Sequence, residues 1–315
     1  MNTFLVIAPG TFTTVQDIGR AGYRHIGVPP SGVLDPFACR VANLLVGNPE
    51  DCAVLEMTLN GTSLAVLEEV DVALTGADMA AVLNHRPMDA WCSVRLMPGD
   101  LLTIGQAHSA CRGYLAVTGG VDVPVIMGSR STNTMAAMGG FRGRALKKGD
   151  FIQVSRCRLL GRPRKLPSEL IPDYRDTAVL HAIPGPQDDY FTEGLQRLFT
   201  RPFAVSTRAD RMGCRLDGPR IPHRKAMPES IISEPIVPGG IQIPADGHPI
   251  ILLNEQTAGG YAKIATVISS DLPKVAQATA GDTIRFKQTD LQTAFHIRLK
   301  AVQHLAHIRK LVARK

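Results

Sequence analysis

The 315-residue chain lacks the short motifs from which many enzymes can be identified. It contains no glycine-rich phosphate loop, no dinucleotide-binding glycine fingerprint and no Gly-x-Ser-x-Gly nucleophile elbow. The six cysteines are scattered, without a Cys-x-x-Cys pair or a histidine at zinc-ligand spacing, which favours reduced thiols in a cytoplasmic protein. No apolar run approaches the length of a membrane span, so association with a membrane is not expected.

Acidic residues are absent from the last 25 positions, and this absence accounts for most of the net charge of +7. The remaining body has 29 basic and 28 acidic residues and therefore lacks the electrostatic footprint of a nucleic-acid-binding protein. Apolar residues of the tail follow helical spacing at Ala294, Ile297, Ala301, Leu305, Ile308 and Val312. This pattern predicts a basic amphipathic helix, packed on the body or on a partner, whose removal leaves the fold intact.

Glycine and proline are abundant, at 29 and 22 residues, and separate short β-type runs. The clearest runs cover 53–59, 71–75, 111–117 and 250–253. Gly-Asp precedes a strand-like run three times, where it supplies the turn, at 99–100, 149–150 and 281–282. Helical spacing with capping residues occurs in few places, at 35–46, 188–199, 271–278 and the tail. The pattern predicts a mainly β chain (α+β) with few helices.

Composition also indicates where structural units begin and end. Residues 161–176 are basic, contain prolines and lack β-type periodicity, as expected of a linker. We therefore expect an N-terminal β-rich lobe over 1–160, a C-terminal β-rich lobe over 177–290 and the helical tail over 291–315.

Several longer blocks are distinctive in their order. They are GTFTTVQDIGRAGYRHIGVPPSGVLDPFACRVANLLVGNPED (10–51), CRGYLAVTGGVDVPVIMGSRST (111–132), DRMGCRLDGP (210–219) and SEPIVPGGIQIPADGHPIILLNEQTAGGYAKIATV (233–267). Together they resemble one family, which comprises the C subunit of prokaryotic 5-oxoprolinase, kinase-inhibitor antagonist proteins, allophanate hydrolase subunit 2 and the carboxyltransferase domain of urea amidolyase. The resemblance is collinear over roughly residues 3 to 287 and implies two cyclophilin-like β-barrel lobes.

Two loops of the N-terminal half carry groups suited to an anionic substrate. The first combines Ser31 and Gly32 with Asp35, which is either a helix cap or a catalytic residue at a helix start. The second offers hydroxyl and guanidinium groups that match a carboxylate or phosphate, from Arg130, Ser131, Thr132 and Arg142. A solvated turn region is the alternative for the second loop.

A third loop lies in the densest part of the resemblance, and its candidate residues are Gln256, Thr257, Gly259, Gly260, Tyr261 and Lys263. Gly-Gly permits close backbone approach to a ligand, and Tyr261 and Lys263 share a face if a strand starts here. The alternative is a hairpin with a core tyrosine and a snorkelling lysine. Arg211 is a further candidate for phosphate binding, although Asp210-Arg211 also suits a structural salt bridge or turn. No metal-ligand set is predicted.

The resemblance implies a component of an ATP-dependent 5-oxoprolinase, which converts 5-oxo-L-proline, ATP and water to glutamate, ADP and phosphate. A smaller B-type subunit and a lactam-opening A-type subunit would be its partners. Lys263, Tyr261 and Asp35 are the catalytic candidates. ATP with Mg²⁺ would bind at a site shared with a partner, because this chain has no phosphate loop, and the chain alone would be inactive.

Two other functions are compatible with the same resemblance. One is a biotin-dependent carboxyltransferase component of urea or allophanate metabolism. It would need a biotin-bearing partner, because the Met-Lys-Met signature of a biotin attachment site is absent from this chain. The other is a non-catalytic antagonist of a kinase-inhibitor protein.

Overall fold

The computed structural model describes residues 2–174, 177–225 and 227–314, which divide into two compact units. The first unit contains the described residues up to Ala21, then Ser31–Tyr174 and the chain from His304 onward. The second contains Gly22–Pro30 and the described residues up to Gln303 that follow Tyr174. A short N-terminal loop therefore belongs to the second unit, and a C-terminal segment belongs to the first.

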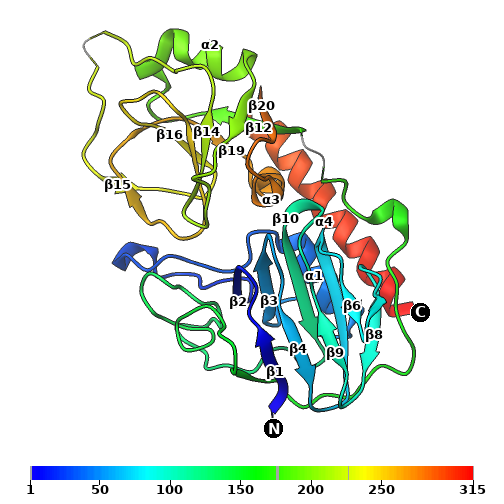
Figure 1. Ribbon diagram of the computed structural model, residues 1–315. Helices are drawn as coiled ribbons and strands as arrows, with labels where there is room; N and C mark the ends of the chain where they lie inside the picture. The colour runs from blue at the N-terminus through cyan, green and yellow to red at the C-terminus, as the bar shows by residue number, and fades with distance from the viewer. Residues whose placement is uncertain (1, 175–176, 226, 315) are drawn as a thin grey trace. The chain divides into compact units, whose positions relative to one another are not determined.

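Two antiparallel sheets form the first unit (Figure 1). The six-stranded sheet has the order β11 (Phe151–Gln153), β1 (Asn2–Ala8), β4 (Ser63–Val66), β9 (Leu101–Thr103), β6 (Val82–Leu83) and β7 (Arg86–Pro87). The five-stranded sheet has the order β2 (Phe12–Gln16), β3 (Val54–Thr58), β10 (Ser109–Val117), β5 (Val70–Asp78) and β8 (Ser93–Leu96).

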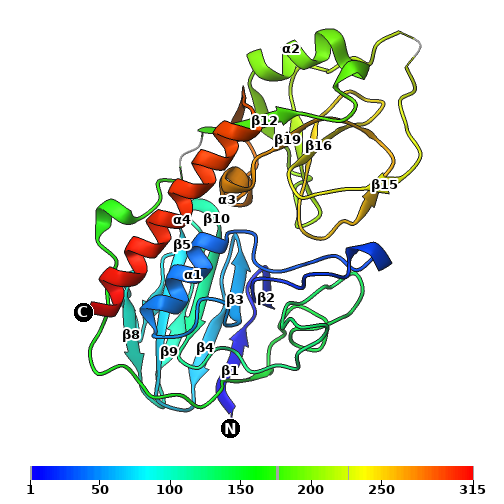
Figure 2. The ribbon, with the colours of Figure 1, turned by 180° about the vertical axis from the view of Figure 1, so that it is seen from behind.

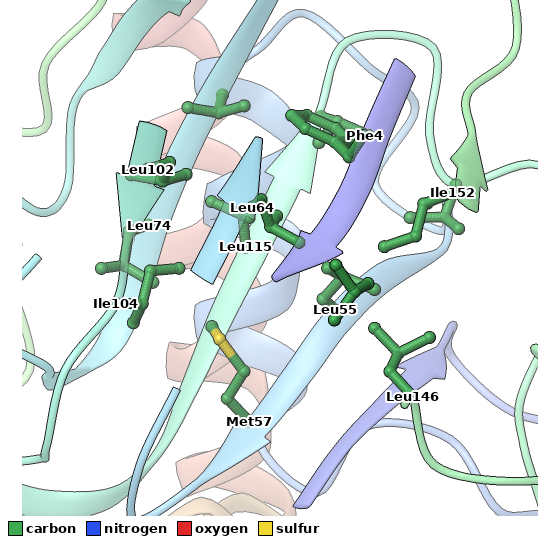
Figure 3. Close-up of a cluster of buried hydrophobic side chains, with 14 of the residues drawn as sticks. Phe4, Leu55, Met57, Leu64, Leu74, Leu102, Ile104, Leu115, Leu146 and Ile152 are labelled. Atoms are coloured by element: carbon green, nitrogen blue, oxygen red, sulfur yellow. The ribbon is translucent and has the colours of Figure 1, made fainter. Parts of the chain in front are cut away.

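The main core of the first unit contains side chains from both sheets (Figure 3). Phe4 and Leu64 come from the six-stranded sheet, and Leu55, Leu74 and Leu115 come from the five-stranded sheet. Successive side chains of a strand point to opposite faces of a sheet. The residues next to Leu55, Leu74 and Leu115 in their strands therefore point to the other face of the five-stranded sheet. That second face is also buried, so the five-stranded sheet is covered on both sides.

Helix α1 (Pro36–Leu45) and the end of α4 (Leu291–Arg314) cover this second face (Figure 2). Tyr114 and Ala116 of β10 belong to the same apolar cluster as Val41 of α1 and Ile308 and Val312 of α4. Ile308 and Val312 are 0% and 3% exposed. The last turns of the tail thus contribute to a hydrophobic core, which argues against the expectation that the tail can be removed without loss of the fold.

A closed seven-stranded barrel forms the second unit (Figure 1). Its strands are β12 (Thr177–Pro184), β19 (Ala262–Val267), β16 (Gly240–Ile243), β17 (Ile250–Leu252), β14 (Gly213–Asp217), β13 (Phe203–Val205) and β20 (Thr283–Gln288). A separate two-stranded ribbon pairs β15 (Glu234–Pro235) with β18 (Ala258–Gly259). Helices α2 (Thr192–Thr200) and α3 (Leu272–Gln277) also lie in this unit. The prediction of a mainly β chain with few helices is confirmed.

Short 3-10 helices occupy several connections in both units. The first unit contains η2 (Ser168–Leu170), and the second contains η1 (Arg24–Ile26), η3 (Asp188–Phe191) and η4 (Ser269–Asp271). The helix predicted at 188–199 consequently begins as η3 and continues as α2.

Each of the three Gly-Asp turns precedes a strand, as predicted. The strands that follow are β9, β11 and β20. The turn glycines have positive φ angles of 95°, 88° and 96°, at Gly99, Gly149 and Gly281, a conformation that most other residues adopt only with strain.

The segment expected to link the two lobes is largely part of the first unit. Leu166 is fully buried there, and Leu170 and Tyr174 pack against the same cluster as α1. Residues 175 and 176 of the expected linker lie outside the described residues. Among the described residues, which include all six cysteines, no disulfide bond is formed. None of the helices among the described residues combines the length and apolar character needed to cross a membrane.

Candidate functional site

A row of side chains, three of them polar, crosses four neighbouring strands of the barrel in the second unit and is called the polar row below. Arg215 of β14 is opposite Ile250 of β17, which is opposite Gln242 of β16, which is opposite Lys263 of β19. Directly opposed residues of antiparallel strands lie on the same face of a sheet. The alternating neighbours, such as Ile251 and Ile241, are fully buried in the barrel, so the row lies on its outer face.

Lys263 is the most buried charged group of this row, with only 8% of its side chain exposed. Its Nζ forms an ion pair with a carboxylate oxygen of Glu234, on the β15–β18 ribbon. Gln187 holds both partners: its Nε2 donates to Glu234 Oε1 at 2.9 Å, and its Oε1 accepts from the Lys263 backbone N at 3.0 Å. Lys263 is thus fixed in position by an ion pair and by a glutamine that bridges the two residues.

Glu234 retains its negative charge in this arrangement. The hydrogen bond from Lys263 is the main cause that lowers the pKa of Glu234, and Gln187 adds to it, while burial acts in the opposite direction. A lowered pKa in the folded state means that the stabilisation is complete above the unfolded pKa and is lost as pH falls through the folded value. Because 38% of the Glu234 side chain is exposed, solvent screening keeps this contribution small.

The two glycines of the third loop make close contacts within the second unit, and their role in ligand binding stays a prediction. A Cβ on Gly259 would lie 2.4 Å from Gln242 Nε2, so this glycine is needed for close packing on Gln242. Gly260 accepts a hydrogen bond from the Ile231 backbone N at 2.8 Å. Tyr261 precedes β19 and is 41% exposed, so it does not share a strand face with buried Lys263. Its catalytic role remains a prediction.

Gln256 lines a cavity of about 260 Å³ that opens on the barrel near the row. Thr257 contributes its carbonyl oxygen, which accepts from the Ile236 backbone N at 3.0 Å.

Arg211 is only 9% exposed and forms an ion pair with Glu255 at 2.9 Å. The phosphate-binding role expected for Arg211 is therefore disfavoured, since removing a buried cation from its partner is strongly destabilising.

The first two loops meet inside the first unit. Gln16 Oε1 accepts from the Gly32 backbone N at 3.1 Å, and its Nε2 donates to the Thr132 carbonyl at 3.1 Å. Asn133 Nδ2 approaches Ser31 Oγ at 3.4 Å. Ser31, Gly32 and Thr132 are all buried, so these groups hold the two loops together rather than forming an open substrate site.

Asp35 is fully buried and acts as the N-cap of α1. Its Oδ1 accepts from the Ala38 backbone N at 3.1 Å, and its Oδ2 accepts from the Tyr174 hydroxyl at 2.6 Å. Side-chain oxygens at an N-cap satisfy N–H groups that the helix itself cannot pair. These contacts confirm the interpretation of Asp35 as a helix cap, and its catalytic role stays a prediction.

Asp17, which the sequence did not single out, organises the second loop. Its Oδ1 accepts from Ser129 Oγ at 2.6 Å and Ser131 Oγ at 2.5 Å, and its Oδ2 accepts from the Arg130 backbone N at 2.5 Å. The Arg130 side chain donates from Nε to the Val123 carbonyl at 3.1 Å. The Ser131 hydroxyl, predicted to bind substrate, thus binds a carboxylate of the chain itself, and the Thr132 hydroxyl donates to the Val15 carbonyl at 2.8 Å.

Arg142 is the exposed cation of this loop. Its guanidinium lies 5.4 Å from the centroid of the Phe141 ring, a cation–π distance. Among the described residues, no cluster of three or more His, Cys, Asp or Glu side chains is arranged to hold a metal ion. Lys263 is a buried positive charge held beside the β15–β18 ribbon, and such a charge can stabilise negative charge on a substrate.

The chain belongs to the carboxyltransferase domain family, subdomains A and B, whose family model matches residues 26–288. The match spans both units and includes the whole polar row.

Two bacterial relatives share nearly the full length of the chain. The C subunit of 5-oxoprolinase from Escherichia coli (strain K12) is 36% identical over 295 residues, which are 93% of each chain. The Haemophilus influenzae protein of the same name is 34% identical over 304 residues, which are 96% of each chain. The crystal structure of the K. lactis urea amidolyase superposes with a TM-score of 0.91 at 33% identity. That protein is much longer: the comparison covers 97% of this chain and 20% of that one.

Proposed function

We propose that this chain is the C subunit of an ATP-dependent 5-oxoprolinase, which opens 5-oxo-L-proline to glutamate while ATP is converted to ADP and phosphate. The observation that carries this proposal is the full-length similarity to the E. coli 5-oxoprolinase C subunit, at 36% identity over 93% of both chains. Because that relative is named as a subunit, the similarity also supports the expectation of partners, namely a smaller B-type subunit and a lactam-opening A-type subunit.

The outer barrel face of the second unit is the site that we assign to this function. A lactam carbonyl is a poor electrophile, and transfer of a phosphoryl group to its oxygen would create a leaving group. Catalysis of phosphoryl transfer consists mainly of positioning and of positive charge around the transferring group. Lys263 supplies that charge in a buried setting, and Glu234 and Gln187 hold it in place.

ATP and Mg²⁺ are proposed to bind where a partner subunit completes the site. The chain has no phosphate loop, and its described residues offer no cluster of three or more metal-ligating side chains. We therefore assign no Mg²⁺ ligand to this chain and derive no step through the metal.

A second candidate function is carboxyl transfer, favoured by the similarity to urea amidolyase. This chain corresponds to only 17% of the Lachancea kluyveri urea amidolyase that it matches. Carboxyl transfer would require a separate biotin-bearing partner, since no biotin signature is present in the sequence.

The purified chain alone is expected to show little or no 5-oxoproline-stimulated ATP hydrolysis, and addition of the smaller partner and the lactam-opening partner is expected to produce it. The physical reason is that this chain offers a positive charge but no phosphate loop. The measurement is phosphate release with and without 5-oxo-L-proline, for each subunit alone and for the mixture. Robust turnover by the isolated chain would contradict the shared site. Biotin-dependent turnover with urea or allophanate in place of 5-oxoproline would favour the second candidate.

A further inference from the structure

A small cavity on the outer face of the barrel lies beside the polar row and combines charged with apolar walls. Its volume is about 260 Å³, and its apolar lining is Met212, Ile250 and Leu252. The remaining lining residues are Arg208, Asp210, Gly213, Arg215 and Gln256. This volume is below the roughly 300–1,000 Å³ of sites for drug-sized ligands, so the cavity suits a molecule of one small ring.

Hydrogen-bonding capacity remains available on the basic side chains of this cavity. Arg215 pairs with Asp246 through Nη2, while its Nε is buried and has no partner. Within the described residues the guanidinium of Arg208 has no hydrogen-bond or ion-pair partner, and the Gln256 side-chain amide has none either. Arg208 is exposed, so a ligand carboxylate can accept from its guanidinium without breaking an existing side-chain contact.

The acidic groups around the cavity limit the kind of ligand that fits. Burial acts to raise the pKa of Asp246, but the His248 amide and the charges of Arg215, His248 and Arg208 outweigh it, and the pKa is lowered. Asp246 is therefore ionised and offsets one of the two guanidinium charges. Asp210 faces the cavity while its Oδ1 accepts from the backbone N atoms of Met212 and Gly213 at 2.7 and 3.0 Å. Two guanidiniums beside a carboxylate match a ligand that carries a carboxylate next to an N–H group.

Leu252 lies between the cavity and Lys263. It lines the cavity, and a Cβ on Gly240 would meet the Val237 carbonyl oxygen at 3.3 Å, Leu252 Cδ1 at 3.7 Å and Lys263 Cδ at 3.9 Å. The space over Gly240 is therefore filled, and Leu252 and the Lys263 stem pack close together at the edge of the cavity.

We propose that this cavity binds the carboxylate and the adjacent N–H group of a small lactam acid, with Arg208 and Arg215 holding the carboxylate. This assignment rests on the proposed function, because 5-oxo-L-proline is the lactam acid of that function. It adds two specificity residues that lie outside the three loops expected from the sequence.

The test is equilibrium binding of 5-oxo-L-proline and of 2-pyrrolidinone, the same lactam without a carboxylate, to the reconstituted complex. Arg208→Met and Arg215→Met are each expected to weaken binding of 5-oxo-L-proline by about tenfold to a hundredfold, the effect of losing a charge-assisted hydrogen bond. Binding of 2-pyrrolidinone is expected to change less than twofold. Arg201→Met, which removes an exposed guanidinium of the same unit, is the matched control.

The outcomes separate this inference from the function on which it rests. If the parent complex does not bind 5-oxo-L-proline, the proposed function fails. If the parent binds it and both variants bind it equally well, the function stands and the cavity assignment is overturned. A loss of ATP affinity without a loss of 5-oxo-L-proline affinity would also overturn the assignment. Arg208 is exposed, so Arg208→Met provides a result even if Arg215→Met, which leaves Asp246 unpaired, fails to fold.

Discussion

Replacing Lys263 with methionine is expected to lower turnover of the reconstituted complex about a hundredfold or more, the usual effect of losing one fixed electrostatic contact in a site shielded from water. Methionine preserves most of the apolar stem that packs beside Gly240. The Glu234 side chain left behind is 38% exposed and can be hydrated, so the melting temperature is expected to fall only slightly. The measurements are 5-oxoproline-dependent ATP hydrolysis and thermal unfolding of the same preparations.

Lys287→Met is the control for this prediction. Lys287 is an exposed lysine on β20 of the same barrel. Its replacement is expected to change neither turnover nor melting temperature appreciably. Turnover of the Lys263 variant within a few-fold of the parent would show that the Lys263–Glu234 pair is structural, and would remove the catalytic claim for this face of the barrel.

Replacing Ile308 with alanine is expected to destabilise the first unit by about 2–5 kcal/mol, the range for deleting buried methyl and methylene groups from a core. Ile308 is fully buried against α1 and the five-stranded sheet, together with Val312. A unit of this size loses roughly 2–4 °C of melting temperature per kcal/mol, so the melting temperature is expected to fall by about 4–20 °C. Truncation of the chain before His304 removes both residues and is expected to have a larger effect.

Val302→Ala on the same helix is the matched control, because Val302 is 54% exposed. Val302→Ala is expected to leave the melting temperature almost unchanged, because most substitutions of exposed residues have little effect on stability. Equal melting temperatures for Ile308→Ala and the parent would contradict the packing of the tail on the first unit. They would instead support the expectation from the sequence that the tail can be removed without loss of the fold.

Local sequence signals were sufficient for the α-helices and for several of the strands. Glycine conformations and turn chemistry act within a few residues, so the strands after Gly99, Gly149 and Gly281 could be predicted directly. The cap at Asp35 and the buried face of the tail through Ile308 follow from equally local patterns. A second apolar face of the same helix was missed, because the sequence was searched for only one helical apolar pattern. This second face is exposed and consists of Leu291, Phe295, Leu299 and Val302.

The candidate site was harder to predict because its partners are distant in sequence. Lys263 was identified from its loop, but Glu234 and Gln187, which hold it, lie 29 and 76 positions away. Ser131 was expected to bind an anion and does so, but the anion is the carboxylate of Asp17, 114 positions away. A hydroxyl or a cation in a loop indicates that it will have a partner, and only the fold decides whether that partner is a substrate or another residue.

Hydrogen–deuterium exchange of the reconstituted complex, with and without 5-oxo-L-proline, tests the location of the site most directly. If the substrate occupies the outer face of the barrel, peptides covering 210–216, 234–242 and 250–263 are expected to become protected. Peptides covering 128–142, where the polar groups of the first unit bind one another, are expected to remain unchanged. Protection confined to 128–142, with none around Lys263, would contradict the assignment of the substrate site to the second unit.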